Sequence, residues 1–333
     1  MTKVQTFFNK VLNFFVNHLQ NALCGSIFAA LEPPSLFIML KSGVVLFLMP
    51  MSIAFEKRFT SEEDIVELLC KRGLRINNSD DVIRHLRHIG YYRFSAYLYP
   101  LLKNPKSSHT FKSDSSFENA LSLYSFDKQL RMWIFSMIES IEVAFRSALA
   151  NRIADKSGNV FWMTDVSMYA NELKFANTML LLDKELKISK EDFIKHYKEK
   201  YYNNYPPAWM LVEILPYGVL TRIYENISDH SLRKIVASEF SLSVPVFTSW
   251  MTTIALLRNA CCHHARVWNK RNAILPMVIR KPMMPWLSKS ADISPVNDMK
   301  AQLEALLVQY PNVDIRAMGF HDSWLNEPLW CHN

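Results

Sequence analysis

Apolar side chains recur at every third or fourth position along most of the chain beyond residue 60, which is the spacing that places them on one face of an α-helix. The longest segment of this kind spans residues 121–152. Its apolar stripe consists of Leu130, Ile134, Met137, Ile138, Ile141 and Phe145, and its charged stripe of Lys128, Arg131, Glu139, Glu142 and Arg146. No stretch alternates convincingly between apolar and polar residues as a β-strand would. The pattern predicts an all-α protein built around a long core helix.

Helix boundary signals divide the rest of this region. Thr60, followed three residues later by Glu63, predicts a capped helix that Gly73 stops, and a second helix is expected over residues 79–90. Later helices are predicted over residues 168–186, 193–202 with Ser189 and Asp192 as its cap, 208 onward after Pro206-Pro207, 232–239 and 298–308. Pro245 marks the opening turn of one more helix, which we expect to continue through residue 270.

This last helix carries the candidate chemistry. Its wheel places polar and cationic side chains in one sector, namely Asn259, His263, Arg266 and Lys270, and apolar ones opposite, namely Leu257, Cys261 and Trp268. His263 lies one turn after Asn259, so their side chains could meet, whereas His264 is expected to be a core histidine. Arg258 flanks the polar sector and could reach into it. Arg258, Asn259 and His263 are therefore the candidate catalytic residues.

The same stretch also contains Cys261-Cys262-His263-His264, whose residue types could suggest zinc. Four consecutive helical residues point in different directions and cannot converge on one metal ion, so we expect no metal and no cofactor. The cysteines number five, an odd count without a regular spacing, which favours reduced thiols and a cytoplasmic protein. The net charge of +7 suits a polyanionic partner such as RNA, although a mildly basic protein with nothing bound would have the same charge.

The Arg258-Asn259-x3-His263 pattern resembles the signature of HEPN-type ribonucleases. Its surroundings resemble the Abi-like abortive-infection family of bacteria over about residues 56–330. The stretches that carry this likeness are residues 89–100 around Tyr91-Tyr92-Arg93-Phe94, residues 138–146 around Glu139 and Glu142, residues 205–215 beginning Tyr205-Pro206-Pro207, residues 258–269, and residues 318–330 with Trp324 and Trp330.

The resemblance implies a HEPN-like helical core with an N-terminal helical region and a C-terminal helical cap. It also implies a metal-independent endoribonuclease of phage defence that leaves 2′,3′-cyclic phosphate ends, with RNA as substrate and a structured non-coding RNA as a further, inhibitory partner. One chain offers one expected catalytic histidine, so a homodimer is expected. The alternative is a non-catalytic sensor that binds RNA or another partner, since some HEPN relatives bind without cutting.

Supporting roles follow from the same resemblance and from the wheel. Glu139, Glu142 and Arg146, together with His264, could orient the site from behind, although Glu142 and Arg146 could equally form a surface pair. Arg266, Lys270 and Arg271 could follow an RNA backbone, or form a solvated rim. Tyr92 and Arg93 could stack on bases and hold phosphate, but a packed aromatic joint between helices is the more frequent outcome.

The expected organisation has four parts: an unmatched apolar segment over 1–50, an N-terminal helical region over 51–118, the HEPN-like core over 119–285, and a cap over 286–333. Residues 36–55 are almost wholly apolar and long enough to span a membrane, so one anchor within residues 35–55 is an alternative. Lys41 and Pro50 would be costly there. Because the resemblance begins just beyond, we favour translation from Met49 or Met51 and expect no stable membrane association.

Overall fold

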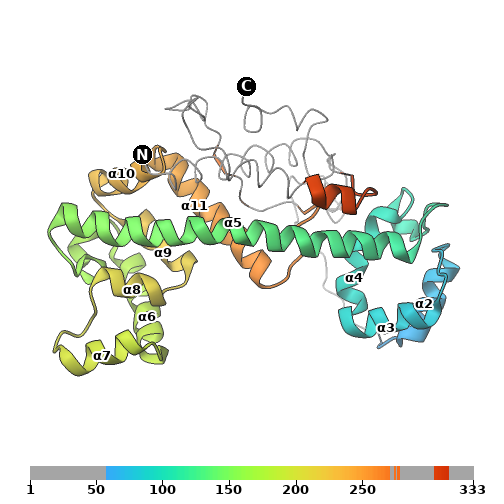
Figure 1. Cartoon of the computed structure of the whole chain (residues 1–333), viewed down its shortest axis with the longest axis horizontal. Helices are drawn as coiled ribbons and strands as arrows, with labels where there is room; N and C mark the ends of the chain where they lie inside the picture. Colours follow the sequence, from blue (N-terminus) through green and yellow to red (C-terminus); the bar gives the residue numbers. More distant parts are fainter. Residues whose placement is uncertain (1–57, 271–273, 275, 278–303, 315–333) are drawn as a thin grey trace, which may run out of the picture. The chain divides into compact units, whose positions relative to one another are not determined.

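The computed structural model describes residues 58–270, 274, 276–277 and 304–314. Within these residues the secondary structure is helical, and extended pairing is limited to isolated bridges such as Leu102 with Phe111 and Tyr169 with Ile227. The predicted all-α class is confirmed. The helices, coloured along the chain in Figure 1, are α2 (Glu62–Lys71), α3 (Ser79–Ile89), α4 (Tyr91–Leu98), α5 (Phe117–Ser157), α6 (Glu172–Ile188), α7 (Asp192–Lys200), α8 (Ala208–Ile214), α9 (Tyr217–Asn226), α10 (His230–Glu239) and α11 (Val244–Cys262). Short 3₁₀ turns cover Tyr99–Leu101, Lys106–Ser108, Trp162–Thr164 and Val166–Met168, and residues 304–309 are also helical.

The described residues form two compact units that divide between Ser122 and Leu123. The first contains α2, α3, α4 and the opening of α5. Its core includes Phe94, which stacks on Phe117 with ring centroids 4.7 Å apart. The helix predicted from a cap at Thr60 begins one residue later, because the hydroxyl of Ser61 accepts the backbone N–H of Asp64 at 3.1 Å. Gly73 follows that helix with a φ of +87°, as a helix-stopping glycine does.

The second unit is organised around the long helix α5. Every residue of its predicted apolar stripe is buried, from Leu130 to Phe145, so the core helix is confirmed and is longer than expected. Phe145 makes edge-to-face contacts with aromatic rings of two other helices, Tyr217 and Tyr224 on α9 and Phe247 on α11. These contacts hold α9 and the first turn of α11 against the same stretch of α5.

The charged stripe of α5 does not face solvent along its whole length. Lys128 and Glu139 are exposed, as expected for that stripe. Arg131 is instead buried, and the side chains of Glu142 and Arg146 are largely buried as well. The three exceptions lie where α8, α11 and the residues after α11 pack against α5, and each has a charged or carbonyl partner there.

The helix predicted from residue 208 onward is divided in two, because the chain leaves the helix at Leu215 and Pro216 between α8 and α9. The other helices of this unit agree with the sequence prediction apart from their ends. Ser189 does not cap α7; it ends α6, and the residue before α7 is Glu191. The predicted helix over residues 298–308 is described only from residue 304 onward, where it is helical. The apolar segment within residues 35–55, both proposed start residues and most of the predicted cap lie outside the described residues.

None of the described helices is by itself long and apolar enough to cross a membrane. Helices α10 and α11 would pass that test together by length and composition, and they are bent by 65° relative to each other.

Candidate functional site

The end of α11 holds the predicted catalytic residues. The helix stops at Cys262, and His263 is its C-cap with φ −87° and ψ 11°. His264 follows in the left-handed region with a φ of +55°. The N–H of Ala265 donates to the carbonyl of Ala260 at 2.9 Å, and that of His264 to Cys261 at 3.1 Å. This pair of bonds is the Schellman motif, in which a left-handed residue closes the helix.

The predicted continuation of this helix through residue 270 is therefore wrong. Arg266 and Lys270 do not lie one and two turns beyond His263 on a helical face, because the chain has already left the helix. His264 is likewise not a core histidine: the turn carries it to the surface, where both His263 and His264 are exposed. Residues 263–268, which we call the histidine turn, thus replace the predicted polar helical face.

The predicted burial of the apolar residues is confirmed, since Leu257, Cys261 and Trp268 are all buried. Burial raises the pKa of the Cys261 thiol to about 12, so this group stays protonated at neutral pH. Among the described residues no three His, Cys, Asp or Glu side chains are grouped as metal ligands.

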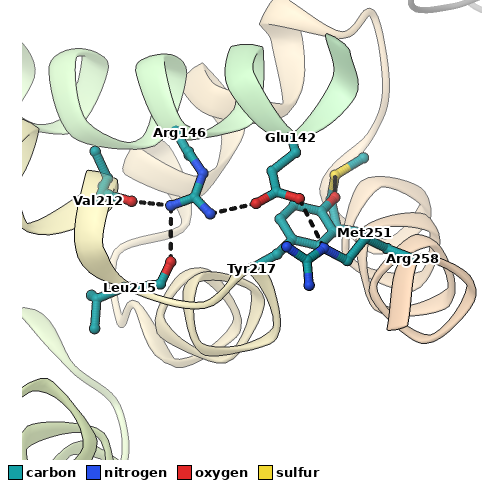
Figure 2. A network of polar contacts seen from close by, with 7 residues as sticks. All are labelled: Glu142, Arg146, Val212, Leu215, Tyr217, Met251 and Arg258. Atoms are coloured by element: carbon teal, nitrogen blue, oxygen red, sulfur yellow. Dashed lines mark hydrogen bonds and ion pairs between the residues drawn. The ribbon is translucent and has the colours of Figure 1, made fainter. Parts of the chain in front are cut away.

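Arg258 joins a chain of polar contacts that links α11 to α5 and α8 (Figure 2). Its Nε lies 3.3 Å from Oε2 of Glu142, and the other carboxylate oxygen of Glu142 accepts from Arg146. Arg146 also donates to two carbonyl oxygens at the end of α8, those of Val212 and of Leu215, the latter at 2.9 Å. Glu142 therefore holds Arg258, while Arg146 holds Glu142 and neutralises part of its charge.

Tyr217 on α9 lies beside this network (Figure 2). Its hydroxyl is buried and donates to the sulfur of Met251 at 3.1 Å. Burial, with a further contribution from the nearby Glu142 carboxylate, raises the pKa of this phenol well above its ordinary value. Tyr217 thus stays uncharged beside the carboxylate.

The other predicted site residues are not part of the network around Glu142 that Figure 2 shows. Asn259 is exposed on the last turn of α11, Arg266 is half-buried and Lys270 is exposed. Glu139 is on the exposed side of α5, away from the buried position that Glu142 occupies one turn later. Tyr92 and Arg93 are both exposed on α4 in the first unit, where Phe94 and Tyr97 form the packed aromatic joint. Arg271 lies outside the described residues.

Sequence reasoning missed Asp127, a fully buried carboxylate on α5. Its Oδ1 accepts the backbone N–H groups of Val267 at 3.0 Å and Trp268 at 2.7 Å, and its Oδ2 pairs with Arg131. The guanidinium of Arg131 also lies 3.5 Å from the carbonyl of Ala265. A signal for this pair exists in the sequence, since Asp127 falls on the apolar stripe of its helix with an arginine four residues later.

The left-handed backbone at His264 can be tested through stability. His264→Gly should leave the free energy of unfolding unchanged or raise it by up to about 1 kcal/mol, because glycine adopts a positive φ without strain. His264→Val should lower it by about 1–2 kcal/mol, because a β-branched residue fits this region badly. Urea unfolding followed by circular dichroism measures both. Equal effects of the two substitutions would contradict the Schellman geometry.

The comparisons with known proteins give one match. A family model described as Abi-like protein matches residues 84–269, which is more than half of the chain. Searches of curated proteins and of solved structures gave no match. The matched stretch runs from α3 to the end of the histidine turn and so includes Glu142, Arg146, Arg258 and Asp127. On this match, and in agreement with the resemblance carried by the sequence motifs, the chain belongs to the Abi-like protein family.

Proposed function

We propose that this protein acts in abortive infection, a defence against phage, as a metal-independent endoribonuclease of the HEPN type. Family membership supports the defence role. The observation that carries the nuclease activity is the arrangement at the end of α11: a guanidinium held by a carboxylate, with an exposed amide beside it and an exposed imidazole one turn later. These are Arg258, Asn259 and His263.

The chemistry of RNA explains why so few groups suffice. The 2′-hydroxyl is an internal nucleophile, so the protein must accept its proton, stabilise the charged phosphorane and protonate the leaving 5′-oxygen. An imidazole can perform either proton transfer near neutral pH. An arginine offers a permanent charge and paired N–H donors to phosphate oxygens. The products are a 2′,3′-cyclic phosphate and a 5′-hydroxyl.

Each group has a defined part in this proposal. Glu142 engages Nε of Arg258, and the two terminal nitrogens of the guanidinium are then the ones that grip the phosphate. Asn259 orients His263 or contacts the phosphate. His263 transfers the proton on one side of the scissile bond, and His263 of a second copy transfers it on the other, which makes the active form a homodimer. Arg266 and Lys270 contact the RNA backbone beyond the cleavage site.

The proposal is tested in cells that express the wild type, Arg258→Ala or His263→Ala, each started at Met51, with and without phage. Wild type alone should arrest growth or fragment RNA, and both variants should accumulate in soluble, folded form without doing so. Sequencing of the cut ends would then identify the target RNA.

The alternative function is a non-catalytic sensor that binds RNA or another partner. The observation in its favour is that Arg258 already has an intramolecular partner, Glu142, and so could serve only to join two helices. If wild type and both variants behave alike under infection, the sensor replaces the nuclease. If protection against phage survives in His263→Ala without RNA fragmentation, binding alone is the activity.

A further inference from the structure

The histidine turn is anchored at both of its ends, by different helices. On the α11 side the Schellman hydrogen bonds from His264 and Ala265 close the helix. On the α5 side Asp127 accepts the peptide N–H groups of Val267 and Trp268. The residues between these anchors have little freedom, although His263 and His264 themselves are exposed to solvent.

The anchor on α5 is a buried carboxylate, and burying a charge costs free energy. Asp127 is 0% exposed, and a carboxylate is tolerated at such a position only when its oxygens are paired and hydrogen-bonded. Arg131 supplies the charge on one oxygen, and two backbone N–H donors satisfy the other. Arg131 also approaches the Ala265 carbonyl, so the pair contacts the turn at three of its peptide groups. Apolar side chains in place of Asp127 and Arg131 could still bury Trp268, but they could not form hydrogen bonds with the backbone of the turn.

The turn also holds His264 in the left-handed backbone region, which is uncommon for a residue other than glycine. Such a conformation persists where the surrounding structure enforces it. The two anchors provide that enforcement from either side of His264.

We propose that Asp127 is a positioning residue for the catalytic histidine: through the backbone of the histidine turn it sets where the His263 imidazole lies relative to Arg258. This inference rests on the proposed nuclease function. Asp127 touches neither RNA nor a reacting atom, and its partner Arg131 belongs to the same anchor. A displacement of a proton-transfer group by about 1 Å can cost on the order of 10²-fold in rate.

The test uses the full chain and a fluorescent single-stranded RNA oligonucleotide that the wild type cuts. Asp127→Asn keeps an oxygen for the two N–H groups but loses the charge that holds Arg131, so kcat should fall between about 10-fold and 10²-fold with KM little changed. Arg131→Lys, which keeps a positive charge but not the reach to Ala265, should lower kcat in the same manner and carries the test if Asp127→Asn does not fold. Ile153→Val, a buried substitution elsewhere on α5, controls for lowered stability and should leave kcat unchanged.

A double-mutant cycle separates positioning from general destabilisation. In a His263→Ala background, Asp127→Asn should cause no further loss of kcat, because the group that it positions is already absent. If Asp127→Asn lowers kcat by the same factor in the wild-type and the His263→Ala backgrounds, the positioning role is overturned while the nuclease proposal stands. A folded Asp127→Asn protein with the kcat of the wild type has the same consequence. If His263→Ala cuts RNA as fast as the wild type, the nuclease proposal itself is overturned.

Discussion

Purified His263→Ala should cleave RNA about 10²–10⁴-fold more slowly than the wild type, because a positioned proton-transfer group contributes about that factor. The loss should appear in kcat and kcat/KM together, since the imidazole acts on the transition state and not on bound RNA. Cleavage by the wild type should persist in EDTA and leave 2′,3′-cyclic phosphate ends. Gel analysis of a labelled oligonucleotide measures the rate of cleavage, its persistence in EDTA and the nature of the cut ends.

The matched control is His196→Ala, which removes an exposed histidine from α7, well before α11 in the chain. It should cut at the rate of the wild type. A comparable loss in both variants would point to a general effect of removing a surface histidine and would contradict the specific role of His263. Cleavage that stops in EDTA would contradict the metal-independent mechanism even if His263 proved essential.

Glu142→Ala should lower the free energy of unfolding by about 3 kcal/mol, because it leaves two guanidinium groups without their shared carboxylate. Only 12% of the Glu142 side chain is exposed, whereas 30% of Arg258 is, so solvent can compensate for part of the loss at Arg258 but little of it elsewhere. Arg146 retains the carbonyls of Val212 and Leu215. Glu142→Gln should cost about half as much, since its amide oxygen still accepts one hydrogen bond.

The control for this change is Glu139→Ala, which removes a carboxylate from the exposed side of the same helix and should alter stability by less than about 0.5 kcal/mol. Urea titration gives the midpoint and the m-value, and an unchanged m-value ensures that stability and not the denatured state has changed. Equal stability of Glu142→Ala and Glu139→Ala would show that the contacts of Glu142 are as weak as those of an exposed pair.

Much of the fold is predictable from the sequence because its main signal is repeated many times. The apolar stripe of α5 recurs over several turns, so one misjudged position changes nothing, and the buried residues from Leu130 to Phe145 follow it. The end of a helix is equally predictable where a glycine marks it, as Gly73 does after α2. The long helix and the all-α class both follow from signals of this kind.

The end of α11 is not predictable in the same way, because the usual stop signal is missing. Residues 256–270 contain neither glycine nor proline, and the left-handed position that glycine normally fills is taken by His264. The helix is closed instead by the hydrogen bonds of His264 and Ala265, and the chain beyond it is held by the Asp127 carboxylate on α5, which lies far away in sequence. Arg266 and Lys270 therefore do not lie on the helical face predicted for them. The contact between Arg258 and Glu142 is unaffected, because both residues lie within regular helix.

Two carboxylates of α5, Glu142 and Asp127, also constrain how many residues lie between Arg258 and Trp268. Glu142 binds the first and Asp127 the peptide of the second, and the distance between the two carboxylates is set by the rise of one helix. An inserted or deleted residue in this interval would break one of the two attachments, while substitutions at its exposed positions would not. Natural variation in this family should therefore alter side chains here but not chain length, so that the number of residues from Arg258 to Trp268 is set by the packing of α11 against α5.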